Sequence, residues 1–436
     1  MTRRTFALLT VAGVLAACGG SDDASTDTTP GDGSTPGEPD AQGFSPVPVS
    51  DREPGGDTAV AGDSITTFGF ELFAGVAAGN DPDADVTISP ASVAIALAML
   101  EPGTVTDAQS QLRTLLSIAD PPAYHSSMNG LEQALESRVP ERVGDGEPGE
   151  ITMRIANAAY LQPGYPFEVD YLDAVGRYYG PVVNELDFAA DPDAAVEVIN
   201  AFVAEATEGR ITDPLASGSI PAETVLALVN TLFLTASWFS PFEQSRTTPA
   251  PFTKLDGSTV DVDMMSGGGD ASRGGDGWVG ATKRHVGGIS SQFVLPDLDR
   301  FDDVASRLAD AFDELTVQAG PGGEFRMPRF ETRVDAPLAD PLKALGLTAP
   351  FEEGNLLGIA DDPRLVVSEV AHSTFVAYDE TGVEAAAATI ILAGTTSAPV
   401  EQPVPVILDR PFFYRILDLD SGATLFLGRV MHPSAA

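Results

Sequence analysis

The apolar residues are distributed unevenly along the chain and divide it into three parts. A short apolar run, residues 6–17, is followed by residues 19–63, which are mostly Gly, Ser, Asp, Thr and Pro. The second part cannot bury enough apolar surface to offset the entropy lost on ordering. From residue 65 onward, apolar residues recur to the C-terminal end. We therefore predict a leader over 1–17, a disordered acidic tether over 18–63 and one folded domain over 64–436.

The helical period begins early in the folded domain. Apolar residues from Phe68 to Val76 are spaced for one face of a helix. Ser89 and Pro90 come directly before the apolar stretch Ala91–Leu100, and a serine followed by a proline is typical of a helix start. A third helix is predicted from Asp193 to Gly209, where apolar residues again recur at helical spacing.

Strand patterns prevail later in the chain. Ile151–Leu161 and Thr224–Leu234 are apolar runs long enough for central strands, and the glycine-rich segment Gly267–Gly277 is predicted to be a mobile loop. Helices first and strands later indicate an α+β domain with large, mixed but mostly antiparallel sheets. Further strands are predicted at Ser291–Leu295, Glu324–Met327, Leu365–Ser368, Ser373–Tyr378, Val404–Leu408, Phe412–Asp418 and Thr424–Val430.

The leader has the features of an export signal. Arg3 and Arg4 precede the apolar run, which is too short to span a bilayer. The sequence Leu-Ala-Ala-Cys at 15–18 resembles the lipobox of bacterial lipoproteins, so Cys18 is predicted to carry a lipid. We expect the protein on the extracytoplasmic face of the membrane or the outer surface, or released outside the cell. An ordinary secretory signal and a twin-arginine signal over 2–6 remain alternatives.

The charge and the cysteine content of the chain argue against some classes of function. The chain has 64 acidic and 24 basic residues, a formal net charge of −40. So large an acidic excess repels phosphate backbones, which argues against a nucleic-acid partner. Cys18 is the only cysteine, so the processed protein can have no internal disulfide and no thiol nucleophile.

Motifs of catalysis are missing from the sequence. There is no Gly-x-Ser-x-Gly, no His-Glu-x-x-His and no phosphate-binding loop ending in Gly-Lys-Ser/Thr. None of the four histidines has a neighbour at the spacing of metal ligands. We therefore predict that the protein is not an enzyme and uses neither a cofactor nor a metal.

A small-residue segment near the C-terminal end carries the strongest functional signal. Alanines favour a helix, whereas the Ile-Ile-Leu at 390–392 favours a strand, so the residues alone also allow a surface helix followed by a loop. The segment, which we call the hinge, consists of Glu380, Thr381, Gly382, Val383, Glu384, Ala385, Ala386, Ala387, Ala388 and Thr389.

The hinge resembles the corresponding motif of the serpin family, and other segments resemble serpins in the same order along the chain. The resemblance covers about residues 65–433 and implies a serpin fold with an exposed reactive loop over about 380–408. The matching segments are Thr87–Ser92, Asn157–Tyr160, Ile199–Val203, Thr207–Ile211, Leu228–Phe233, Trp238, Pro241–Phe242, Met327–Phe330, Leu345–Leu347, Arg410–Phe412 and Leu425–Arg429.

The resemblance implies a suicide inhibitor of a serine protease, or of a cysteine protease, that forms a covalent 1:1 complex as a monomer. Insertion of the cleaved loop as a strand into the main sheet is the known property of the family. In a strand of period two, Val383, Ala385 and Ala387 share one face and Glu384 lies on the other. Such a face can enter a sheet, whereas a non-inhibitory serpin with a binding or structural role remains the alternative.

The family pattern also assigns site residues. It implies that Ser89, Ser92, Asn230 and His372 form a polar cluster where the central strands part, and that Trp238 lies at the upper opening, the shutter and breach of serpins. It places Glu380 near Arg329, as an ion pair.

The scissile bond is placed differently by two ways of counting. Counting from the hinge places it at Thr396–Ser397, which we favour, and counting back from Pro411 moves it toward Val400. The window Ala393–Val400 lacks Arg, Lys and aromatic residues. We therefore expect elastase-like or subtilisin-like targets.

Overall fold

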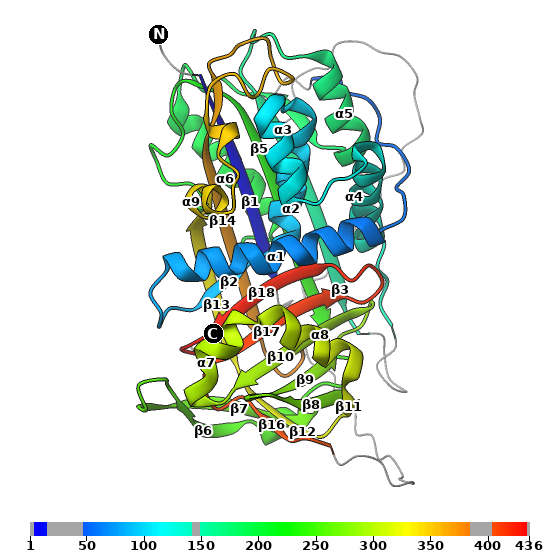
Figure 1. The fold of residues 1–436 in the computed structure, drawn as a ribbon, viewed down its shortest axis with the longest axis vertical. Coiled ribbons are helices and arrows are strands. Elements are labelled where there is room, and N and C mark those ends of the chain that lie inside the picture. Colours follow the sequence, from blue (N-terminus) through cyan, green and yellow to red (C-terminus); the bar gives the residue numbers. More distant parts are fainter. Residues whose placement is uncertain (1–3, 15–46, 142–148, 384–402, 434–436) are drawn as a thin grey trace, which may run out of the picture.

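The computed structural model describes residues 4–14, 47–141, 149–383 and 403–433, and for residues 4–14 it describes the backbone alone. Helices prevail in the first half of these residues and strands in the second (Figure 1). The helices are α1 (Ala59–Gly79), α2 (Pro90–Leu100), α3 (Thr106–Leu115), α4 (Pro121–Glu136), α5 (Val169–Tyr179), α6 (Pro192–Ala206), α7 (Phe301–Ser306), α8 (Leu308–Gln318) and α9 (Ala339–Ala344), with 3-10 turns at Glu101–Gly103, Gln244–Arg246, Leu298–Arg300 and Ala349–Phe351.

A large mixed sheet, here called the main sheet, runs through the centre of the molecule. Its strands lie side by side in the order β13, β14, β1, β5, β3 and β4, and the short β15 lies between β14 and β5. β1 is parallel to both of its neighbours and β3 is parallel to β4, whereas the other pairs are antiparallel. The strands are β1 (Arg4–Val14), β3 (Ile151–Leu161), β4 (Val182–Glu185), β5 (Thr224–Ser237), β13 (Phe330–Pro337), β14 (Leu365–Tyr378) and β15 (Gly382–Val383).

Two further sheets lie at one end of the main sheet (Figure 1). One has the order β11, β8, β9, β10, β17, β18, β2, and the other has the order β16, β12, β7, β6. Their strands are β2 (Val86–Ile88), β6 (Thr248–Thr253), β7 (Thr259–Gly268), β8 (Ala271–Gly275), β9 (Trp278–Arg284), β10 (Ile289–Pro296), β11 (Gly320–Pro321), β12 (Glu324–Pro328), β16 (Val406–Ile407), β17 (Phe412–Asp418) and β18 (Thr424–Val430).

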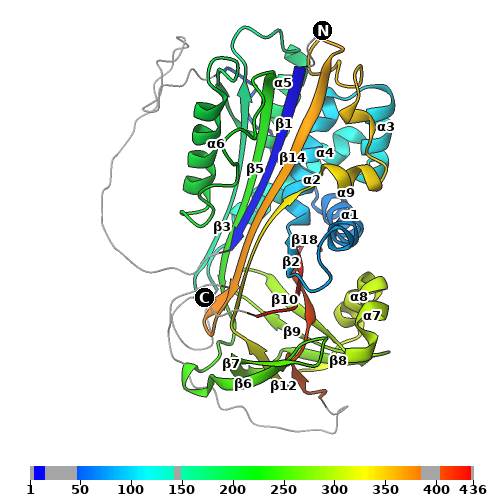
Figure 2. The same cartoon turned by 90° about the vertical axis from the view of Figure 1, so that its left-hand side faces the viewer.

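Helices cover both faces of the main sheet. Figure 2 shows α6 on one face and α1 and α2 on the other. Under α6, the side chains of Val196, Ile199 and Val203 pack with Val229 and Phe375 of the sheet in a small separate core. The larger core joins the other face of the sheet to α1, α2 and the second sheet.

Helix α2 is apolar on all sides because it is buried on all sides. Every residue from Pro90 to Leu100 is buried. The Ser89 side chain caps the helix by accepting a hydrogen bond from the Ser92 backbone N–H, and Pro90 occupies the first turn, where no N–H donor is needed. This start fixes both serines in the interior, against the main sheet.

The predicted α+β class with large, mostly antiparallel sheets is confirmed. β3 and its bounds coincide with the predicted strand, and β5 extends the predicted strand to Ser237. The helix predicted from Asp193 is α6. The two short strands predicted between Leu365 and Tyr378 are one long strand, β14, in the structure.

The prediction of a mobile loop at Gly267–Gly277 is wrong. β7 runs to Gly268, and β8 then pairs with β9 in a hairpin. Close packing explains Gly275, since a Cβ atom on it would lie 2.2 Å from the ring of Trp278. The glycine content that suggested mobility reflects a tight contact with an aromatic side chain.

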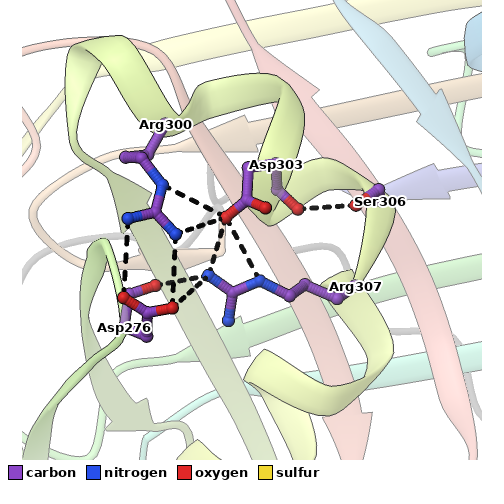
Figure 3. Close-up of polar contacts among 5 residues, drawn as sticks. All are labelled: Asp276, Arg300, Asp303, Ser306 and Arg307. Carbon is purple, nitrogen blue, oxygen red and sulfur yellow. Dashed lines mark hydrogen bonds and ion pairs between the residues drawn. The ribbon is translucent and has the colours of Figure 1, made fainter.

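The turn between β8 and β9 is also fastened to the helices beside it. Arg300 binds the carboxylates of Asp276 at 3.2 Å and Asp303 at 2.7 Å, and Arg307 reaches Asp303 at 2.9 Å (Figure 3). All four side chains are partly or largely exposed, so this network adds little to stability and serves to position the turn.

The chain is ordered well before the predicted end of the tether at residue 63. Residues 47–58, here called the strap, have no regular secondary structure but lie along β4, α4 and α5, and α1 begins at Ala59. Val47 N donates to Val183 O at 2.9 Å and Glu53 N donates to Arg177 O at 2.8 Å. Composition did not reveal the strap because mainly backbone hydrogen bonds, Arg52 and two apolar side chains, Val47 and Val49, hold it.

The predicted leader contributes Arg4–Val14 as β1, and its removal stays a prediction. Among the helices in the described part of the chain, none is both long and apolar enough to cross a membrane.

Candidate functional site

Strands β5 and β14 run parallel to each other with β1 between them, and we call the space that β1 fills the slot. Within the described residues, β5 and β14 are connected in the sheet through β1 and β15. The slot is therefore one strand wide. The register of β1 runs from Arg4 opposite Leu365 to Gly13 opposite Phe375 on β14, and from Thr5 opposite Thr224 to Val14 opposite Leu234 on β5.

The four residues of the predicted polar cluster meet halfway along the slot. Ser92 Oγ donates to Asn230 Oδ1 at 2.5 Å, and Ser89 N donates to His372 Nε2 at 3.0 Å. All four residues are buried. Asn230 and His372 lie on opposite sides of the slot, and both face Thr10 of β1 in the register. Any strand that occupies the slot must pass between the two strands that carry these side chains.

The cluster continues through residues that were not predicted from the sequence. Asn230 Nδ2 donates to Asn157 Oδ1 at 2.8 Å, and Asn157 Nδ2 donates to Glu132 Oε2 at 2.9 Å. Arg52 of the strap donates to the same carboxylate oxygen at 2.8 Å. Burial raises the pKa of Glu132 to about 8, although Arg52 and Asn157 oppose the shift. The one available signal was the amide of Asn157 within the more apolar half of β3.

An aromatic stack closes the end of the slot where β5 and β14 terminate. Trp238 stacks on His285 and Tyr378, with ring centroids 4.0 Å and 5.6 Å apart. Trp238 Nε1 donates to the Asp379 carbonyl at 3.0 Å, just before the hinge. His285 Nδ1 donates to the Ala236 carbonyl at 2.9 Å, and burial lowers the pKa of His285 to about 3, so the ring is neutral. No pattern in the sequence indicated this role for His285.

The structure contains the ion pair between Glu380 and Arg329. Arg329 Nε donates to Glu380 Oε2 at 2.8 Å and Nη2 donates to Oε1 at 2.6 Å, and Thr247 donates to the same carboxylate. Burial alone would raise the pKa of Glu380, but these hydrogen bonds outweigh it and hold the pKa below its usual value. The two-pronged contact fixes the start of the hinge on the neighbouring β12–β13 connection.

The hinge enters the main sheet by two residues. Val383 pairs with Tyr378 of β14 and with Ala236 of β5, both antiparallel, and is buried. Gly382 lies so close to β5 that a Cβ atom on it would be 2.2 Å from the Ala236 carbonyl oxygen. The chain turns into the slot through Asp379, whose Oδ1 accepts the Gly382 N–H at 3.1 Å.

Several predicted site residues lie outside the described residues. They are Cys18, the remaining hinge residues Glu384, Ala385, Ala386, Ala387, Ala388 and Thr389, and the predicted scissile pair Thr396 and Ser397.

The described side chains line a slot that holds one strand. Its polar groups are mainly amides, hydroxyls and imidazoles engaged in structural hydrogen bonds, flanked by the ion pair of Glu380 with Arg329. Within the described ranges, no group of three or more His, Cys, Asp or Glu side chains is placed to hold a metal ion. What the geometry offers is a slot for one strand and a hinge that starts to enter it.

A family model for serpins, described as serine protease inhibitors, matches residues 63–433. This chain belongs to the serpin family. Members of the family are in general protease inhibitors and not enzymes. Curated relatives include neuroserpin of Homo sapiens, 30% identical over 370 residues, which cover 80% of this serpin and 87% of the relative. A serpin-like protein of Thermococcus kodakarensis is 31% identical over 377 residues, covering 85% of each chain.

Solved structures confirm the serpin fold. The native state of the thermophilic serpin tengpin matches with a TM-score of 0.75 and 23% identity, covering 88% of this serpin and 97% of that chain. Thyroxine-binding globulin in complex with thyroxine matches with a TM-score of 0.72 and 23% identity, covering 86% and 99%. At these identities the two likenesses show the fold alone.

Proposed function

We propose that this serpin, once its leader is removed, inhibits a serine protease as a suicide substrate. The observation that carries the proposal is β15, because Gly382 and Val383 already begin a strand between β5 and β14. The residues that follow are small, and those on the inner face of a continued strand, Ala385 and Ala387, are uncharged. A strand with such a face can be added to a sheet at little desolvation cost.

In the proposed reaction, the protease serine attacks the carbonyl carbon of Thr396, and the amine of Ser397 leaves. The acyl-enzyme then holds the freed loop at its new end. Extension of β15 along the slot would carry the protease to the far end of the main sheet and distort its active site before water hydrolyses the ester. A cysteine protease would form the corresponding thioester.

The proposed targets accept small uncharged residues beside the bond they cleave. The window Ala393–Val400 contains no Arg, Lys or aromatic residue, which disfavours enzymes with acidic or large apolar specificity pockets. Elastase-like and subtilisin-like proteases fit best.

We also propose that Cys18 carries a lipid that holds the inhibitor at the extracytoplasmic face of a membrane. A labelled fatty acid should be incorporated by the natural sequence and not by Cys18→Ala. Equal labelling of both forms would refute the assignment.

A protein with the serpin fold can also bind a small molecule, as thyroxine-binding globulin does in its complex with thyroxine. For the present chain, a non-inhibitory role would leave a cleaved loop and a fully active protease.

The deciding experiment uses the chain from residue 18 with Cys18→Ser, here called the processed chain. It is mixed with subtilisin and with pancreatic elastase and analysed on a denaturing gel. We expect a band at the summed mass that survives SDS, together with a released peptide that begins at Ser397. Clean cleavage with full protease activity would favour the non-inhibitory role.

A further inference from the structure

Strand β1 of the leader and strand β15 of the hinge lie end to end in the slot. On β5, Val14 of β1 lies opposite Leu234, and Val383 of β15 lies opposite Ala236. If the antiparallel ladder of β15 continued, Glu384 would lie opposite Thr235 and Ala385 opposite Leu234. Ala385, the second residue beyond β15, would therefore need the backbone partner that Val14 already has.

The two strands also run in opposite directions. β1 is parallel to β5 and β14, whereas β15 is antiparallel to both. Because the slot is one strand wide, the leader and an inserted loop exclude each other along its whole length.

The slot must either hold a strand or close so that β5 and β14 pair directly. β5 is buried throughout and β14 is buried along most of its length, and backbone N–H and C=O groups at a buried strand edge need hydrogen-bond partners. β1 supplies them from Thr5 to Gly13 on both sides at once. Helix α2 packs directly against β1, so this strand belongs to the interior.

The leader sequence suits a central strand. Residues 5–14 contain neither a charged residue nor a proline, the two features that a strand paired on both edges excludes. Both arginines of the leader, Arg3 and Arg4, precede this stretch.

We infer that the slot is a binding site for the leader itself: while attached, residues 4–14 occupy it as an internal strand and stop loop insertion before Ala385. Removal of the leader then converts a blocked precursor into the active inhibitor. The consequence for inhibition rests on the proposed function, whereas the binding of the leader does not.

Hydrogen–deuterium exchange of the whole chain with Cys18→Ser tests the binding directly. Leu9→Asp places a charge at the middle of the ladder, opposite Val229 and Ala371, and Gly19→Asp places the same charge beyond β1. We expect the amides of residues 5–14 to exchange at least about 100-fold more slowly in the parent and in Gly19→Asp than in Leu9→Asp. Exchange of these amides at free-chain rates in the parent would overturn the inference.

Protease trapping provides the second readout. We expect elastase to cleave the loop of the whole chain without forming an SDS-stable complex, while Leu9→Asp and the processed chain form one. If the whole chain traps elastase as efficiently as the processed chain, the leader does not block the slot and the inference fails. If no form traps the protease but the leader amides are protected, the proposed function fails and leader binding stands. Should Leu9→Asp not fold, the processed chain replaces it in the trapping readout, and the exchange of residues 5–14 in the parent is compared with free-chain rates.

Discussion

Gly382 occupies a position where a side chain has no room. A Cβ atom there would lie 2.2 Å from the Ala236 carbonyl oxygen and 2.8 Å from the Ser237 Cα. We expect Gly382→Ala in the processed chain to force β15 away from β5 and to cost about 1–3 kcal/mol in the free energy of unfolding, measured with urea. Gly274→Ala in β8 is the matched control, since its Cβ would meet nothing within 4 Å. Equal losses in both variants would contradict the predicted clash.

Because of the Glu380–Arg329 ion pair, the free energy of unfolding should fall at acid pH. The pKa of Glu380 is below its usual value in the folded protein, so its contribution is complete above about pH 4.5 and is lost as the pH falls through the folded value. Arg329→Gln should cost about 1.5–3 kcal/mol at pH 7 and remove this acid-dependent part. Urea unfolding at a series of pH values measures both.

The control for that pair is Arg326→Gln, which breaks the exposed contact with Glu324. We expect this variant to lose less than about 1 kcal/mol, because both side chains are well solvated. If it destabilises the protein as much as Arg329→Gln, the buried position of Glu380 is not the reason for the effect.

Some residues of the site could be predicted from the sequence, and others could not. Ser89, Ser92 and Asn230 are predictable because each lies in a segment that resembles the family, whereas His372 was assigned from the family pattern without a matching segment of its own. Glu132 could not be found in the same way, since its local pattern is that of an ordinary polar helix residue. Its burial depends on the strap, which comes from a distant part of the chain.

Helix α4 connects the strap to the main sheet through Glu132, and this connection should respond to pH. The pKa of Glu132 is raised to about 8 by burial, so its ionisation opposes folding increasingly as the pH rises from about 4.5 toward 8. We expect Glu132→Gln to gain stability relative to the parent over this range. The measurement is urea unfolding of both forms at pH 5 and pH 8.

Glu71→Gln, on the exposed side of α1, is the control for the pH series and should leave the dependence unchanged. A constant difference in stability between Glu132→Gln and the parent at both pH values would show that the carboxylate does not titrate in this range.

At the scale of elements, long buried segments were predictable and short or competing ones were not. Helix α2 and strand β5 are buried over their full length, and both of them, like most of β3, are rich in apolar residues, which leaves a clear pattern. The hairpin of β8 and β9 escaped prediction because its glycines accommodate Trp278, a contact invisible in local sequence. The leader has the pattern of an export signal, and the same apolar run also satisfies the requirements of a central strand.

For the whole molecule, cleavage of the loop should produce a more stable form. Insertion of the loop into the processed chain adds a strand hydrogen-bonded on both edges, and at about 0.5–1.5 kcal/mol for each bond the melting temperature should rise by about 10 °C or more. Ala387→Arg places a charge on the inner face and should abolish the rise, whereas Ala386→Arg, on the opposite face, should retain it. Differential scanning calorimetry before and after elastase treatment measures the change. A rise of equal size in both arginine variants would argue against insertion in the expected register.

The presence of β15 before any cleavage also bears on the speed of trapping. Starting a new ladder is the slow, entropically costly event, since the first pairing must fix a loop before other contacts compensate for it. In this serpin the pairs of Val383 with Tyr378 and Ala236 already exist. Insertion therefore extends an existing strand and need not start a new one. Its rate should be set by how quickly β5 and β14 separate ahead of the growing strand. The length of loop that remains outside should have little effect on this rate.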